Sequence, residues 1–261
     1  MQVASLGSGS RGNGTLIEDG DTCLLVDLGF SVRETVHRLE RLDRLPSDIN
    51  AVLVTHEHSD HIGGVLPFIL RFDIPVFMTA GTRDSRAFTK ICEKLGAFNP
   101  VECFSPHKPF TIGSITIEPV AVPHDASEPC QFVFSNSVHR VGLLTDTGYI
   151  TPHVQRQYQN LDVLLLESNY DPEMLDSGPY PYRLKQRISG SQGHLSNAQA
   201  ASLLAGIDIR RLQHLVISHI SEKNNLPALV TSAITEVLDD WRGELTLAGQ
   251  DDGTQWITPF G

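Results

Sequence analysis

The sequence is poor in basic residues, in cysteine and in long apolar runs. Its 20 lysines and arginines stand against 31 aspartates and glutamates, a formal net charge of −11, which disfavours broad, nonspecific binding to nucleic acid. A nucleic-acid enzyme stays open, because bound divalent cations and a few local basic side chains can reverse the field at one site. The four cysteines include no C-x-x-C pair, so we expect reduced thiols in a cytoplasmic protein.

The chain also lacks the segments that direct a protein into or across a membrane. No run of 18 or more apolar residues occurs, so we predict no membrane-spanning helix and no membrane partner. The first residues contain neither a basic stretch nor a long apolar core, and we expect no signal peptide. No repeat or low-complexity linker interrupts the chain, so residues 1–261 are predicted to form a single domain.

Short β-type runs alternate with helix-like segments along the chain. The predicted strands are residues 22–28, 51–55, 76–79, 115–122, 131–134, 140–145, 163–167, 215–218 and 245–247. The predicted helices are residues 31–42, 82–95, 197–204 and 228–241. Mixed strands and helices in one continuous core indicate an α/β fold with two sheets covered by helices.

The most informative feature is the segment 56–61, which reads H-x-H-x-D-H directly after an apolar run. Side chains alternate faces in an extended segment, so His56, His58 and Asp60 are predicted to converge on one point. His61 then approaches from another side. Imidazole and carboxylate groups this close together are typical of a site for zinc, iron or manganese.

Further candidate ligands occur where other apolar runs end. Asp27, His124, Asp146 and His219 each follow such a run directly or within two residues. Sites are commonly built from loops that a rigid sheet holds in place, although a single polar residue there is more often a cap or a turn residue. Together with the segment 56–61 they supply enough ligands for two metal ions.

These residues, in this order, resemble the motifs of the metallo-β-lactamase fold superfamily over nearly the whole chain. Less specific motifs at residues 7–15, 167–171, 178–181, 193–197 and 218–225 resemble its YycJ/WalJ branch, which is associated with 5′→3′ exonuclease activity on DNA. The Gly-His and Ser-His pieces are also similar to motifs of nuclease members such as tRNase Z and RNase J.

The resemblance implies an αββα sandwich with the site at one rim between the two sheets. It also implies the ligand set: one metal on His56, His58 and His124, a second on Asp60, His61 and His219, with Asp146 bridging the two. Asp27 is expected to lie behind the ligands and to orient a ligand histidine, as imidazole ligands generally require. The cofactors are thus expected to be two divalent ions, either zinc, manganese or iron.

Two such ions can share a hydroxide that attacks phosphorus in line. Asp60 and His194 are the candidate catalytic residues. The nuclease relatives have a histidine at the position of His194, where it serves the phosphate or the leaving group. The alternative for His194 is a structural residue ahead of the helix cap Ser196.

Six residues are candidate substrate contacts. The basic residues of the segment 183–187 can hold a nucleic-acid backbone or simply face solvent. The Gly/Ser-rich opening can bring polar side chains to the rim of the site or form a plain turn. The candidates are Ser8, Asn13, Arg183, Lys185, Arg187 and Asn224.

The predicted function is that of a dinuclear metal-dependent phosphodiesterase, specifically a 5′→3′ DNA exonuclease. A second interpretation is a hydrolase of a small cyclic phosphodiester, thioester or lactone on the same fold, because metal-activated water attacks carbonyl or phosphorus alike. A third is a metal-binding regulatory protein without turnover.

Residues 168–193 form the one stretch long enough to cover the site, and their prolines and glycines predict a shaped loop. The sequence leaves the oligomeric state open.

Overall fold

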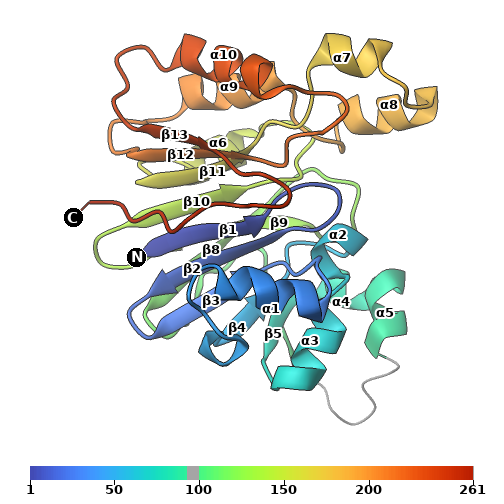
Figure 1. Ribbon diagram of the computed structural model, residues 1–261, viewed down its shortest axis with the longest axis vertical. Coiled ribbons are helices and arrows are strands. Elements are labelled where there is room, and N and C mark those ends of the chain that lie inside the picture. Colours follow the sequence, from blue (N-terminus) through green and yellow to red (C-terminus); the bar gives the residue numbers. More distant parts are fainter. Residues whose placement is uncertain (93–99, 261) are drawn as a thin grey trace.

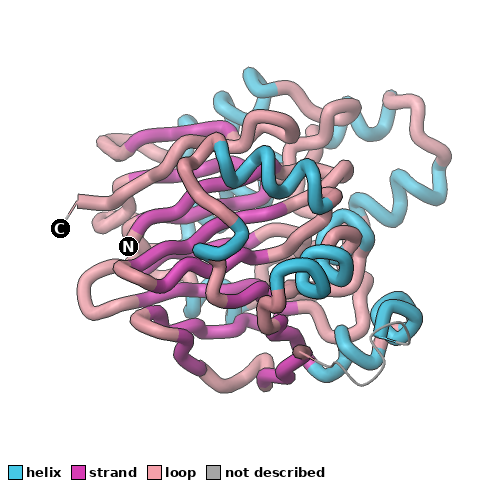
Figure 2. Tube along the Cα trace, turned by 60° about the horizontal axis from the view of Figure 1, so that its bottom comes forward, coloured by secondary structure: helices cyan, strands magenta, loops and turns pink. Residues whose placement is uncertain are grey.

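Two β-sheets pack face to face between layers of helices in the computed structural model, which describes residues 1–92 and 100–260 (Figure 1). Helices α1 (Val32–Glu40) and α3 (Val65–Phe72) cover one sheet. Helices α6 (Pro152–Gln157), α9 (Asn197–Gly206) and α10 (Pro227–Val237) cover the other. Figure 2 shows the strands of both sheets running through the middle of the molecule with helices outside them. The predicted αββα sandwich is confirmed.

The N-terminal sheet follows the order of the chain. Its strands are β1 (Gln2–Gly7), β2 (Gly14–Asp19), β3 (Thr22–Val26), β4 (Ala51–Leu53), β5 (Val76–Thr79) and β6 (Val101–Phe104). The pairs β1–β2 and β2–β3 are antiparallel, whereas β3 to β6 are parallel. Because parallel strands end at the same edge, the residues after β3 and β4 lie side by side.

The C-terminal sheet has the order β13-β12-β11-β10-β9-β8-β7. Its strands are β7 (Phe110–Ile112), β8 (Ile115–Ala121), β9 (Cys130–Ser135), β10 (Arg140–Leu144), β11 (Val163–Glu167), β12 (His214–Ser218) and β13 (Glu244–Leu247). Strands β10 to β13 are parallel, and β7 to β10 are antiparallel. The ends of β10, β11 and β12 therefore meet at one edge.

Alternating side chains connect the layers. In β3, Leu24 and Val26 pack between the sheets against residues such as Phe132 and Leu143, whereas Leu25 points to the layer of α1 and α3. This period of two is what a strand buried on both faces requires. The sheets thus form a rigid frame whose strand ends carry the polar residues described below.

The remaining helices are short and lie beside the sheet ends. They are α2 (Ser59–Ile62), α4 (Ala80–Asp84), α5 (Arg86–Cys92), α7 (Pro172–Ser177), α8 (Tyr182–Ser189) and a 3₁₀ turn, η1 (Pro46–Asp48). In Figure 1, α2 and α8 lie at the end of the sheets opposite the two chain termini. Within the described residues, the longest apolar helices are too short or too polar to cross a membrane.

Each predicted strand overlaps an observed one, but two other predictions need correction. The single helix predicted at 82–95 is two helices, α4 and α5, because Ser85 is extended and its hydroxyl caps the second by accepting from Phe88 N. Residues 93–95 of that prediction lie outside the described residues. The loop predicted at 168–193 contains α7 and α8, which begin at Pro172 and directly after Pro181, where proline is compatible with a first turn.

Candidate metal centre

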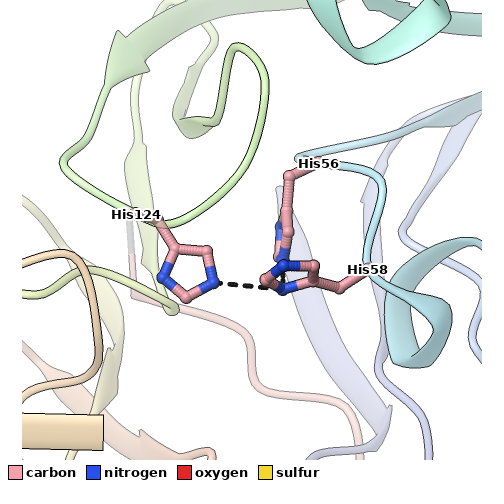
Figure 3. A group of neighbouring side chains, drawn as sticks. All are labelled: His56, His58 and His124. Atoms are coloured by element: carbon pink, nitrogen blue, oxygen red, sulfur yellow. Dashed lines mark hydrogen bonds between the residues drawn. The ribbon is translucent and has the colours of Figure 1, made fainter. Parts of the chain in front are cut away.

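Three histidine rings converge beyond the ends of β4 and β8 (Figure 3). His58 Nδ1 lies 3.0 Å from His56 Nε2 and 3.2 Å from His124 Nε2. Three imidazole nitrogens from two separate loops thus point at one another. Such a group can be satisfied by a single cation, since imidazole nitrogen is a common ligand of divalent transition metals.

Contacts of the outer ring nitrogens determine which nitrogen of each ring faces the other two histidines. His124 Nδ1 donates to the carbonyl oxygen of Gly193 over 2.9 Å, which leaves the lone pair of Nε2 facing the other two rings. His56 Nδ1 lies 2.9 Å from the hydroxyl of Thr55. Burial lowers the pKa of His56 well below its usual value and also lowers the pKa of His124, so both rings are held neutral. Neutral imidazole is the form that binds metal.

A second group consists of Asp60, His61 and His219. The Oδ2 atom of Asp60 lies 3.4 Å from His61 Nε2 and 3.9 Å from His219 Nε2. The structure corrects the expectation that Asp60 converges with His56 and His58. The chain turns into α2 at Ser59, so the alternation of an extended segment ends before Asp60 and its carboxylate joins the second group.

Asp146 lies between the two groups. Its Oδ2 atom is 3.1 Å from His61 Nε2, and its Oδ1 atom is 3.1 Å from His219 Nδ1. Its ligand atom also lies within 4.8 Å of that of His56. The buried Oδ2 has no hydrogen-bond partner among the described residues. A buried carboxylate oxygen left in this state is costly unless a cation neutralises it.

Three residues of the site adopt positive φ angles that non-glycine residues seldom take. They are Asp27 (58°), Asp146 (47°) and His219 (52°), and each follows the end of a strand. Such conformations persist where the surrounding structure enforces them, and they are concentrated at functional sites. Here they turn the side chains from the sheet edge into the site.

The charge balance of the site also favours a bound cation. Burial opposes protonation of His61 and His219, but nearby carboxylates, Asp146 foremost, raise the pKa of both rings above the usual histidine value. The protein alone thus compensates its buried carboxylates by protonating histidines. Divalent cations can neutralise the same carboxylates and leave the rings free to bind. The residues present therefore fit divalent metal ions.

Glu167, the last residue of β11, lies beneath two of the histidines. Its Oε1 atom is 2.6 Å from His194 Nδ1 and 3.3 Å from His219 Nδ1. Its Oε2 atom accepts from the backbone N–H of Leu195. Ser196 then caps α9, so the loop that carries His194 is fixed at both ends. The sequence did not place Glu167 in the site, although its position at a strand end was the available signal.

The carboxylate of Asp27 holds the ring of His61. His61 Nδ1 donates to Asp27 Oδ2 over 2.7 Å, and Thr55 N donates to Asp27 Oδ1 over 2.9 Å. The Gly29 position allows this loop to approach α2, because a Cβ there would lie 1.9 Å from the carbonyl oxygen of Asp60. Thr55, which links Asp27 to His56, was missed from the sequence.

Ser8 and Asn13 are buried behind the ligands. Ser8 Oγ accepts from the backbone N–H of His219 over 2.9 Å. Asn13 Nδ2 lies 3.3 Å from Asp60 Oδ2 and 3.1 Å from His61 Nε2. Both were predicted as substrate contacts, but their contacts are to the ligand residues and the loops that carry them.

A cleft of about 460 Å³ opens above the metal-binding groups. Of the six predicted substrate contacts, Arg187 lines this cleft, and its guanidinium pairs with Asp125. Arg183 and Lys185 lie on α8 outside the lining, and the Lys185 ammonium donates to the carbonyl oxygen of Asp176. Asn224 is buried beside the cleft.

The cleft also contains residues that the sequence did not single out. Asn169 fixes the loop of His219 by donating to its carbonyl oxygen over 2.9 Å. Tyr180 and Gln250 also line it. Asp125 Oδ1 lies 3.5 Å from both His58 Nε2 and His124 Nε2. No repeating pattern marks these residues, because they reach the site from separate loops.

Comparisons with known proteins agree with this arrangement. Residues 22–220 match the family model described as a β-lactamase superfamily domain. Exodeoxyribonuclease YycJ of Bacillus anthracis is 33% identical over 243 residues, which cover 92% of this chain and 90% of that protein. Exodeoxyribonuclease WalJ of Streptococcus pneumoniae is 36% identical over 229 residues, which cover 88% and 85%.

Solved structures show the same fold at lower identity. The metallo-β-lactamase fold protein YhfI of Bacillus subtilis superposes with a TM-score of 0.71 at 18% identity, covering 97% of this chain and 99% of that one. Zn²⁺-bound PqqB of Methylobacterium extorquens has the same TM-score at 19% identity, with coverage of 99% and 100%. The chain therefore belongs to the β-lactamase superfamily, as a YycJ-like protein with the metallo-β-lactamase fold.

Proposed function

We propose that this protein is a metal-dependent nuclease that removes nucleotides from the 5′ end of DNA. The observation that carries the proposal is the position of Asp146, whose two oxygens lie 3.1 Å from His61 and His219 of the second group. Its carboxylate also lies within 4.8 Å of the ligand nitrogen of His56 in the first group, and Asp146 lines the cleft. Two adjoining cation sites are the arrangement that phosphodiester hydrolysis commonly uses. The two exodeoxyribonuclease relatives matched over most of their length support DNA as the substrate.

The proposed ligands of the first metal are His56, His58 and His124, and those of the second are Asp60, His61 and His219, with Asp146 shared. When bound, two divalent ions supply Lewis-acid activation of water and neutralise charge on the phosphate. Zinc, manganese and iron all suit imidazole and carboxylate donors. Asp27 holds the ring of His61 in the tautomer whose Nε2 accepts a metal.

His194 is proposed to serve the leaving group. Water attacks phosphorus, the bond from phosphorus to the leaving oxygen breaks, and that oxygen takes a proton from His194. The close contact between Glu167 Oε1 and His194 Nδ1 supports this role, since the carboxylate orients the ring. His194 lines the cleft and is 19% exposed, so a substrate can reach it.

Arg187 is proposed to contact the phosphate backbone from the cleft wall. It is the basic side chain of the segment 183–187 that lines the cleft. The chain has an overall charge of −11, so a local cation and bound metals are needed to attract DNA.

We also propose a cytoplasmic location. Cys23, Cys103 and Cys130 are free thiols, which supports it.

The test is nuclease activity of metal-reconstituted protein on single- and double-stranded DNA labelled at the 5′ end. We expect metal-dependent release of labelled nucleotides that both Asp60→Ala and His61→Ala abolish. Asp84→Ala is the matched control, because Asp84 is exposed and pairs with Arg83 away from the cleft. A protein that binds two metals but leaves DNA intact would contradict the proposal and favour a small phosphodiester or thioester substrate.

A further inference from the structure

Helix α8 turns its apolar side chains toward the cleft and away from the core. None of its residues is buried. Leu184 and Ile188 are one turn apart and line the cleft, with Arg187 on the same face between them. The apolar face of a surface helix normally packs against a sheet or another helix. In this helix the same face is left available to a molecule in the cleft.

Tyr180 extends this wall beyond the start of the helix. It lines the cleft and lies between Pro179 and Pro181, which restrict the backbone on both sides of the ring. The segment also packs closely at Gly178, where a Cβ would lie 2.7 Å from Asn224 Oδ1. The aromatic ring is thus presented to the cleft by a segment with little conformational freedom.

Apart from Ile220, the other side chains that line the cleft are polar. They include Ser10, Gln250 and Glu222 together with the candidate metal ligands. The apolar wall and the metal ligands meet at Arg187. Its guanidinium pairs with Asp125, and Asp125 Oδ1 lies 3.5 Å from His58 Nε2. A molecule whose phosphate lies at the metal ligands therefore has the apolar wall beside it.

We infer that Tyr180, Leu184 and Ile188 form a binding site for the nucleobase of the nucleotide being removed. This inference rests on the proposed nuclease function and adds the location at which the base binds. A base is flat and apolar on its faces and stacks on aromatic side chains whatever its identity. The cleft, at about 460 Å³, falls in the range of small-ligand pockets. The terminal nucleotide must leave its duplex stack to enter, so unpaired ends are the preferred substrate.

The test compares two single-stranded oligonucleotides of equal length, one with a 5′-terminal thymidine and one with a 5′-terminal abasic residue. With wild-type protein we expect the abasic end to lower kcat/KM between about 5-fold and 150-fold, the effect of losing one stacked base. Tyr180→Ala should lower kcat/KM by a similar factor on the thymidine end and leave the abasic end nearly unchanged. Tyr180→Phe should retain the preference for a base.

Tyr182→Ala is the matched control, since Tyr182 is 72% exposed and lies outside the cleft lining. A second readout is inhibition by thymidine 5′-monophosphate relative to 2-deoxyribose 5-phosphate, a preference that Tyr180→Ala should remove. If wild-type protein cleaves both oligonucleotides equally, or Tyr180→Ala affects both equally, the base site is wrong while the nuclease proposal stands. If wild-type protein cleaves neither, the nuclease proposal itself fails.

Discussion

The ring of His61 and the carboxylate of Asp27 form a buried pair, with 2.7 Å between His61 Nδ1 and Asp27 Oδ2. The same carboxylate accepts from the backbone and the hydroxyl of Thr55. Both oxygens of Asp27 are thus engaged by donors from Thr55 and His61. These contacts hold a proton of His61 on Nδ1, so that Nε2, which faces Asp60 and Asp146, is the nitrogen available to a metal.

We expect Asp27→Asn to weaken binding of the second metal about 10- to 100-fold while the fold is retained. The asparagine amide N–H cannot accept from His61 Nδ1, so the ring changes tautomer and presents an N–H to the metal. The backbone itself is not strained further, since asparagine tolerates the positive φ of this position. Metal titration by calorimetry measures the affinity and the number of ions bound.

The control for this change is Asp73→Asn. Asp73 also has a positive φ, of 54°, but is exposed at the end of α3. The Asp73→Asn variant should bind both metals as wild-type protein does. Equal metal affinity in the Asp27 and Asp73 variants would mean that the buried carboxylate has no part in holding the ligand.

The contact of Glu167 with two histidines predicts different effects for two variants. His194→Ala should lower the turnover of DNA by about 10²- to 10⁴-fold and leave metal content unchanged, because it removes a proton donor only. Glu167→Gln should lower both turnover and metal content, because Glu167 also lies 3.3 Å from His219 Nδ1. Turnover on labelled DNA and metal content by elemental analysis separate the two.

His107→Ala serves as the control for loss of a histidine, since His107 is exposed between β6 and β7. A His194→Ala variant with full metal content and full turnover would remove the assignment of His194 as a proton donor. A Glu167→Gln variant that loses turnover alone would limit Glu167 to orienting His194.

The strand ends were the part of the site that could be predicted from sequence. Asp27, Asp146 and His219 were recognised because each follows an apolar run, and the sheets then bring these ends to one edge. The short-range geometry was less predictable. Asp60 was expected to face the same way as His56, but α2 begins at Ser59 and redirects it. A local pattern cannot reveal a turn that packing against the Gly29 loop fixes.

The substrate side of the site was the least predictable. The basic residues at 183–187 were expected either to hold a nucleic-acid backbone or to face solvent. In α8, Lys185 lies on another side of the helix from Arg187, and Arg183 lies one turn before Arg187 and outside the cleft lining. Ser8 and Asn13 were predicted as substrate contacts because they belong to the Gly/Ser-rich opening of the chain. Their burial against ligand residues depends on contacts with β12 and α2, which are remote in sequence.

Removing the metals is expected to lower the melting temperature. With free metal at about 100 times its dissociation constant, binding to the native state contributes about 2.7 kcal/mol at each site, which corresponds to roughly 5–10 °C per site for a chain of this size. Asp146→Asn should remove most of this difference. The metal-free form of that variant should be less stable than metal-free wild-type protein. Burial opposes ionisation of Asp146, but the rings of His219 and His61 lower its pKa well below the usual range, and the variant loses this favourable pairing. Calorimetric melting with and without chelator measures both effects. An equal metal-induced shift in both proteins would contradict the role of Asp146.

The different positions of Arg187 and Arg183 on α8 predict unequal contributions to DNA binding. Arg187 lines the cleft and pairs with Asp125, whereas Arg183 is exposed outside it. In a His194→Ala background, in which cleavage of DNA is slow, Arg187→Gln should weaken binding. It should also reduce the slope of log affinity against log salt concentration by about 0.7–0.9, the value for one lost phosphate contact on single-stranded or duplex DNA. Arg183→Gln, which makes the same chemical change one turn away, should change neither quantity. Equal effects of the two substitutions would indicate that α8 attracts DNA through its overall charge and that no phosphate is held at Arg187.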